Sequence, residues 1–113
     1  MQFRQGDVFV ERVEDGELPD GAVELARDNG RVVLAYGEVT GHAHAIAERT
    51  ATLFSKPDNQ DRWLVIGWAD GVPEGSAATI RHEEHAPISL APGLYRITHQ
   101  REYAPGEIRR VAD

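Results

Sequence analysis

The chain has 113 residues and a formal net charge of -7, with 12 Lys and Arg against 19 Asp and Glu. Its length suits a single domain over residues 1–113, and its acidic field disfavours nucleic acid as a partner. It contains no cysteine, which excludes disulfides, thiolate metal sites and thiol nucleophiles, so any bound metal must be held by nitrogen and oxygen.

The N-terminal segment, Met1 to Asp7, has no basic region followed by an apolar stretch. No segment approaches the ~20 apolar residues that a membrane span needs. The sequence therefore predicts a soluble cytoplasmic protein without a membrane segment. It also lacks the phosphate-binding loop of P-loop proteins and the Gly-x-Ser-x-Gly elbow of serine hydrolases.

Turn-forming residues recur along the whole chain, as at Asp15-Gly16, Asn29-Gly30 and Pro92-Gly93. Between them lie runs of strand-forming composition with period-two alternation, at residues 7–13, 22–26, 31–36, 42–48, 51–55, 62–68, 78–82 and 94–103. The pattern predicts an all-β domain of about eight short strands, arranged as a small barrel or a jelly-roll-like sandwich.

The run 42–48 contains the first candidate site. On a strand, His42, His44 and Glu48 point to one face because side chains alternate. Residues two apart lie roughly 6.5 to 7 Å from each other, a span that two imidazoles can close onto one ion. Imidazole nitrogen and carboxylate oxygen are good ligands for divalent metals. The alternative is that both histidines hydrogen-bond to neighbouring backbone at a strand end.

The second candidate site is the segment from His82 through Glu83 and Glu84 to His85. Its histidines are one residue too close for the helical His-Glu-x-x-His motif, and Pro87 disfavours a helix. We expect a strand up to His82 and a turn over 83–87, with His82 pointing inward and His85 at the rim, both as candidate metal ligands. The alternative is a solvated acidic loop.

The last run contains a candidate pocket wall. Tyr95, His99, Arg101 and Tyr103 share one strand face with Ile97. Such a face suits a small anionic ligand, with Arg101 pairing with a carboxylate or phosphate. The alternative is that Tyr95 and Ile97 belong to the core and the other three form a surface cluster.

The segment 37–48 resembles the first signature of the cupin superfamily, which is a glycine, a spacer, His-x-His, three or four residues and a glutamate. Gly37, His42, His44 and Glu48 stand at those positions, with a spacer of four residues where five is usual. The resemblance implies a small β-barrel in which the two histidines and the glutamate bind a metal. It also implies a third histidine from a second signature.

The second cupin signature is only partly present. Pro73-Glu74-Gly75 matches its Pro-x-Gly, but no histidine follows three positions later, and His82 is the nearest candidate. The combination of Gly-Glu-Val-Thr-Gly-His-Ala-His at 37–44 with Gln-Arg-Glu-Tyr at 100–103 also resembles a family of small uncharacterised bacterial and phage proteins. That second resemblance implies no function.

Two functions are compatible with these patterns. The first is a cupin-like protein whose histidine cluster holds a divalent metal ion, with Zn, Fe, Mn and Ni not distinguished. The second is a non-catalytic β-barrel module that binds a small ligand or a protein partner and whose histidines are structural. Catalysis follows from neither pattern. Small β domains often pair through an edge strand, so a homodimer is also expected.

Overall fold

The computed structural model describes residues 1–14, 16–37 and 41–99. Within these ranges the chain forms ten strands and no helix. The strands are β1 (Gln2–Gln5), β2 (Val8–Arg12), β3 (Val23–Glu24), β4 (Val32–Tyr36), β5 (Ala43–Ile46), β6 (Ala51–Lys56), β7 (Asn59–Ile66), β8 (Ala78–His82), β9 (His85–Leu90) and β10 (Gly93–His99). The predicted all-β fold is therefore confirmed.

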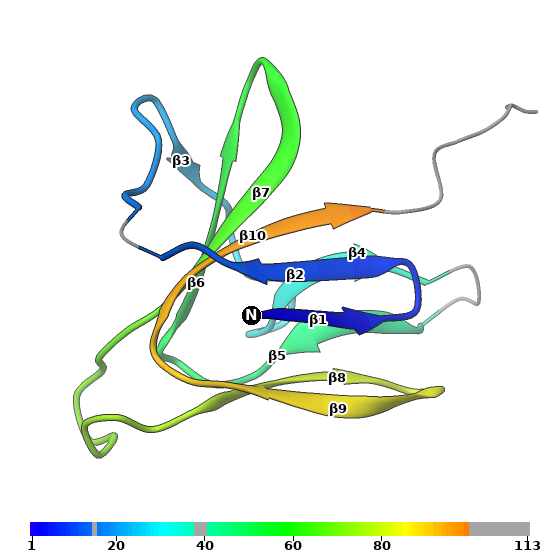
Figure 1. The fold of residues 1–113 in the computed structure, drawn as a ribbon. Helices are drawn as coiled ribbons and strands as arrows, with labels where there is room; N and C mark the ends of the chain where they lie inside the picture. The colour runs from blue at the N-terminus through cyan, green and yellow to red at the C-terminus, as the bar shows by residue number, and fades with distance from the viewer. Residues whose placement is uncertain (15, 38–40, 100–113) are drawn as a thin grey trace, which may run out of the picture.

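The strands form two antiparallel sheets (Figure 1). The larger sheet has six strands in the order β1-β2-β10-β7-β6-β3, and the smaller has four in the order β4-β5-β8-β9. The sheets do not close into a barrel, so of the two predicted architectures the sandwich is the one observed. In the residues described, no helix is long and apolar enough to cross a membrane.

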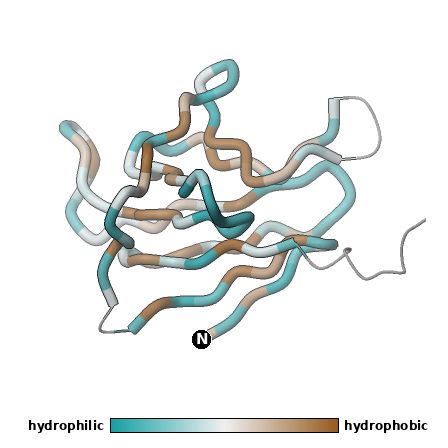
Figure 2. The backbone as a smooth tube through the Cα atoms, turned by 90° about the horizontal axis from the view of Figure 1, so that it is seen from above, coloured by the Kyte–Doolittle hydropathy of each residue, from teal (hydrophilic) through white to brown (hydrophobic). Residues whose placement is uncertain are grey.

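The core lies between the two sheets because alternate side chains of each strand point inward. The larger sheet contributes Val8, Val10, Leu53, Leu64, Ile66, Tyr95 and Ile97, and the smaller contributes Val32, Leu34, Ile46, Ile80 and Leu90. Each fully buried aliphatic side chain stabilises the fold by about 1.5–3 kcal/mol. Figure 2 shows this alternation along the backbone, where short hydrophobic stretches in brown are interrupted by hydrophilic stretches in teal.

Two strands were not predicted from the sequence. β1 carries almost no apolar alternation, since its residues are Gln2, Phe3, Arg4 and Gln5. The first three residues of β9 were predicted to lie in a turn over 83–87. The observed turn contains only Glu83 and Glu84. Pro87 is compatible with β9 because β9 is an edge strand, whose outer side needs no backbone donor.

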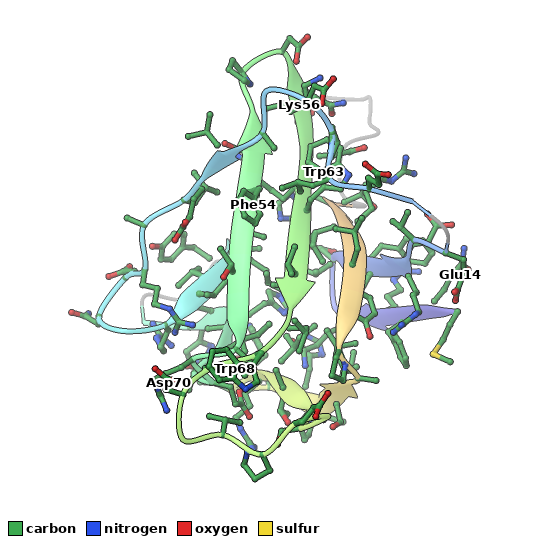
Figure 3. All side chains as sticks on the ribbon, turned by 90° about the vertical axis from the view of Figure 1, so that its left-hand side faces the viewer. Glu14, Phe54, Lys56, Trp63, Trp68 and Asp70 are labelled. Carbon is green, nitrogen blue, oxygen red and sulfur yellow. The ribbon has the colours of Figure 1, made fainter. Side chains whose placement is uncertain are left out.

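Several predicted strands end earlier than expected, and in β5 and β7 this changes where a singled-out residue lies. β5 ends at Ile46, so Glu48 lies outside it. β7 ends at Ile66, so Trp68, the last residue of the predicted run 62–68, lies past the strand and is 71% exposed. Figure 3 shows Trp68 beside the loop that holds Asp70, away from the pair of Phe54 and Trp63 on the β6–β7 hairpin.

One end of the sandwich gathers segments that are distant in sequence. The β1–β2 turn, the start of β5, the β8–β9 turn and the end of β10 all lie at the right-hand side of Figure 1. The apolar core stops before this end is reached, and the side chains that continue inward there are polar. The candidate site occupies this position.

Candidate metal centre

All five histidines of the chain line one pocket of about 270 Å³ at this end of the sandwich. They are His42, His44, His82, His85 and His99, and together they define what we call the histidine pocket. His42 directly precedes β5 and His44 lies near its start, His82 and His85 come from the β8–β9 hairpin, and His99 ends β10. Both sheets therefore contribute to the pocket.

His82 lies at the middle of the cluster. Its ring is stacked on that of His44, with centroids 4.2 Å apart, and lies 4.7 Å from that of His85. The ring of His42 meets it edge-on at 5.8 Å. Because His82 and His85 are directly paired across the β8–β9 hairpin, a two-residue turn brings both rings into the pocket.

Gln5 fixes the orientation of the His44 ring. The amide nitrogen of Gln5 donates to the carbonyls of Ile80 at 3.1 Å and Ala86 at 2.9 Å. Its amide oxygen lies 2.8 Å from Nδ1 of His44 and can only accept. Nδ1 of His44 therefore carries the proton, and the lone pair is on Nε2. Orientation of a metal-binding histidine by a buried hydrogen bond is a common feature of metal sites.

Burial keeps His44 neutral. Its side chain is only 6% exposed. The pKa of His44 is lowered from 6.5 to about 4, mainly by desolvation and in addition by the positive charge that His82 and His85 can carry, while Asp7 opposes the shift. A neutral imidazole with a free lone pair is the form that binds a metal.

Glu84 contacts two other histidines of the cluster. Its carboxylate lies 3.4 Å from Nδ1 of His42, which leaves Nε2 of His42 free to bind a ligand. Its backbone N–H donates to Nδ1 of His82 at 3.0 Å. Since Nδ1 of His82 accepts this bond, the neutral ring carries its proton on Nε2. A metal can therefore bind His82 only if this bond breaks.

The residues that come closest to a metal-binding geometry are His42, His82 and Glu83. One ligand atom from each lies within 4.8 Å of the others. The backbone N–H of Ala43 donates to the Glu83 carboxylate at 3.0 Å, and this bond is the largest cause that holds the pKa of Glu83 below its usual value. Glu83 is therefore an anion at neutral pH and ties the hairpin turn to β5.

Gly6 allows the β1–β2 turn to approach the cluster. Its φ is +59°, and a Cβ at this position would lie 2.8 Å from Nε2 of His85 and 3.3 Å from Cε1 of His44. A side chain here would be strained by the backbone conformation and would displace His85. The turn therefore closes the pocket with backbone, and Asp7 lies beside it in the pocket wall.

The structure does not bring Glu48 to the histidines. Four residues of extended chain separate it from His44, a span of about 13 Å, and Ile46 between them is buried in the core. Its backbone carbonyl accepts a hydrogen bond from Arg27 at 2.7 Å in the loop after β5. The carboxylates near the histidines belong instead to Asp7, Glu83 and Glu84.

The predicted ligand-binding face on β10 is divided. Tyr95 is only 1% exposed and belongs to the core, where its hydroxyl donates to the carbonyl of Ala91 at 2.6 Å and accepts from Arg12 at 2.9 Å. His99 does line the pocket. Arg101 and Tyr103 lie outside the described residues.

No pattern in the sequence indicates the role of Gln5. Its contact with His44 depends on the packing of β1 against the β8–β9 hairpin, and no local pattern around Gln5 indicates that packing. Glu83 and Glu84 were visible as an acidic pair between two histidines. Their position at the pocket, however, depends on the two-residue turn, which was predicted to be longer.

Residues 4–100 match a family whose description is Domain of unknown function (DUF8820). The chain belongs to this family. The matched range contains every residue that lines the histidine pocket. No curated protein and no solved structure matches the chain. What the site can bind is therefore inferred from its own chemistry.

Proposed function

We propose that this protein is a cupin-like metal-binding protein that holds a divalent metal ion in the histidine pocket. One observation carries the proposal: five histidines, from three separate parts of the chain and from both sheets, line the same small pocket. Structural histidines are usually satisfied one at a time by nearby backbone groups, and a shared pocket is not needed for that.

His42, His82 and Glu83 are the proposed ligands that start the site, because their ligand atoms are already close together. His44 is the next candidate, since Gln5 leaves its Nε2 lone pair free. A set of imidazoles with one carboxylate suits Zn, Fe, Mn or Ni. The likeness to cupins then consists of the His-x-His on β5 and a third histidine from a distant strand.

A second function is favoured by one observation. His44 is buried and already hydrogen-bonded to Gln5, as expected of a histidine that only stabilises the fold. A non-catalytic β-sandwich module with structural histidines, binding a small ligand or a protein partner, would contain such a residue. Metal binding distinguishes the two functions.

The test is metal analysis of protein purified without a histidine tag, followed by calorimetric titration of chelator-treated protein with Zn²⁺. The parent protein is expected to bind the ion, and His42→Ala and His82→Ala are expected to lose most of the affinity. Equal metal content in the parent and in both variants would overturn the proposal and favour the structural role.

Two glutamate variants make the test sharper. Glu83→Gln removes the carboxylate that lies with the histidines, whereas Glu48→Gln removes the one that the cupin motif indicates. We expect Glu83→Gln to weaken Zn²⁺ binding and Glu48→Gln to leave it unchanged. The reverse result would mean that the motif, and not the observed geometry, identifies the carboxylate ligand.

A further inference from the structure

A second hollow adjoins the histidine pocket. This groove, of about 510 Å³, lies between β4 and the larger sheet and shares Ala35, Tyr36 and His99 with the pocket. Its volume is in the range of small-molecule sites. Apolar side chains make up much of its wall, namely those of Leu25, Val32, Leu34 and Leu53. We call it the Arg62 groove after the one arginine in its wall.

The alternation of β7 places Arg62 on the inner face of the sheet. Leu64 and Ile66, two and four residues further along, point into the core, so Arg62 points to the same side. It is paired with Ile97 of β10, which is also an inward residue. Arg62 therefore extends an inward row past the point where the core ends, and its side chain is half-buried.

The guanidinium of Arg62 has weak partners. It donates to the backbone carbonyls of Gln60 at 3.1 Å and Asp61 at 3.4 Å, which are its own neighbours in the chain. Within the described residues, no carboxylate lies at ion-pair distance from it, whereas Arg12 has one such partner and Arg96 has two. A half-buried arginine beside an apolar wall is suited to a planar anion, which it can bind through two parallel hydrogen bonds.

The negative charge around the groove favours a ligand with one negative charge over a ligand with two. Asp28 stands in the wall, where it accepts a hydrogen bond from the Tyr36 hydroxyl, and the whole chain is acidic. A phosphate dianion would be repelled by the Asp28 carboxylate and by the net negative charge of the chain. A monocarboxylate with an apolar body matches one arginine and the apolar side chains.

We propose that the Arg62 groove binds a small organic acid, with its carboxylate paired to Arg62 and its apolar body against Leu34 and Leu53. The ligand's other end would lie toward His99 and the histidine pocket, since the two hollows share that wall. In the histidine pocket that end could contact a bound metal ion, and this contact is the one part of the inference that rests on the proposed function. The carboxylate subsite itself needs no metal.

The test is titration of the chelator-treated, metal-free protein with hexanoate, followed by backbone amide NMR shifts and calorimetry. We expect saturable binding with shifts at Val32 to Tyr36 and around Arg62. Hexanamide, which has the same body without the charge, is expected to bind at least about tenfold more weakly, since one charged pair is worth about that factor. Equal binding of both probes, or tighter binding of inorganic phosphate, would overturn the proposal.

Variants assign the anion partner. Arg62→Gln is expected to weaken hexanoate binding by between about tenfold and about a hundredfold. Arg62→Lys, which keeps the charge but loses the two-pronged geometry, is expected to fall between the parent and Arg62→Gln. Arg81→Gln is the matched control, because Arg81 is an exposed arginine outside this groove. Unchanged affinity in both Arg62 variants with intact melting temperatures would refute the assignment.

The two proposals can fail separately. Hexanoate binding to a protein that never binds Zn²⁺ would support the subsite and refute the metal centre. If the protein binds Zn²⁺ but does not bind hexanoate, either with saturating Zn²⁺ or without metal, the metal centre is supported and the carboxylate subsite is refuted. If both hold, loading with Zn²⁺ is expected to change hexanoate affinity in the parent but not in His42→Ala.

Discussion

The two halves of the inner face differ in chemistry although the same strands build them. Ile46, Ile80, Ile97 and Leu64 lie in the core, and on each of these strands a polar residue stands two positions away at the pocket end: His44, His82, His99 and Arg62. The alternation that buries the core therefore also directs these polar side chains inward. One strand face can thus build the apolar core at one end and line a polar pocket at the other.

The largest expected effect concerns the apolar half. Ile97→Ala should lower the free energy of unfolding by about 2–5 kcal/mol, because it removes buried methyl groups and leaves a cavity. Urea denaturation measures the change. A loss below about 1 kcal/mol would mean that this row does not form a tightly packed core.

The second-largest expected effect is a pH dependence of stability, which should arise from the histidine half and not from the apolar half. The pKa of His44 falls from 6.5 to about 4 on folding, so between these values the unfolded chain binds the proton and the folded one does not. Above pH 6.5 His44 is neutral in both states. As the pH falls from 6.5 toward 4, proton binding to the unfolded chain lowers the free energy of unfolding by up to about 3 kcal/mol. The measurement is urea denaturation of metal-free protein at pH 7 and pH 4.5.

His44→Gln is the comparison for that experiment, because glutamine does not titrate. Protonation of carboxylates elsewhere in the chain also destabilises the folded protein in acid. The informative quantity is therefore the difference between variant and parent. The variant should lose less stability than the parent over this pH interval. Equal losses would show that burial of His44 has no thermodynamic consequence.

Gln5 should have an intermediate effect. Gln5→Ala leaves Nδ1 of His44 and the carbonyls of Ile80 and Ala86 without their partner, which should cost about 1–3 kcal/mol of stability. It should also weaken Zn²⁺ binding about tenfold, as loss of an orienting bond does in metal sites. Gln2→Ala, an exposed glutamine of the same strand, is the control and should change neither quantity.

The smallest effect is expected at the pocket end of β10. His99→Ala should change the free energy of unfolding by less than about 0.5 kcal/mol, because the side chain is exposed. Ile97, two residues earlier on the same face, is the internal reference. A large destabilisation by His99→Ala would show that the pocket end belongs to the core after all.

The sequence was sufficient for the fold class and for the inward placement of His42, His44 and His82. Alternation is a local property, and it holds wherever the strand continues. Strand ends are not local, because sheet pairing decides them. That is why Glu48, expected beside His44, lies past the end of β5, and why Pro87 lies in a strand.

The contacts of Gln5 and the inward placement of Arg62 could not be predicted for the same reason. Gln5 sits in a strand with little apolar signal, and Arg62 was read only as the start of a strand. Both gain their role from contacts between strands that are far apart in sequence. The tautomer of His44 is set by such a contact and has no signature in the residues around it.

The bridge that Gln5 makes also bears on the order of folding. Its amide reaches carbonyls 75 and 81 residues further along the chain. β1 must therefore wait for the distant β8–β9 hairpin before the His44 ring is oriented. Contacts of such sequence separation form slowly. We expect the proposed ion to bind only after the two sheets have assembled, so that metal binding would follow folding and would not guide it.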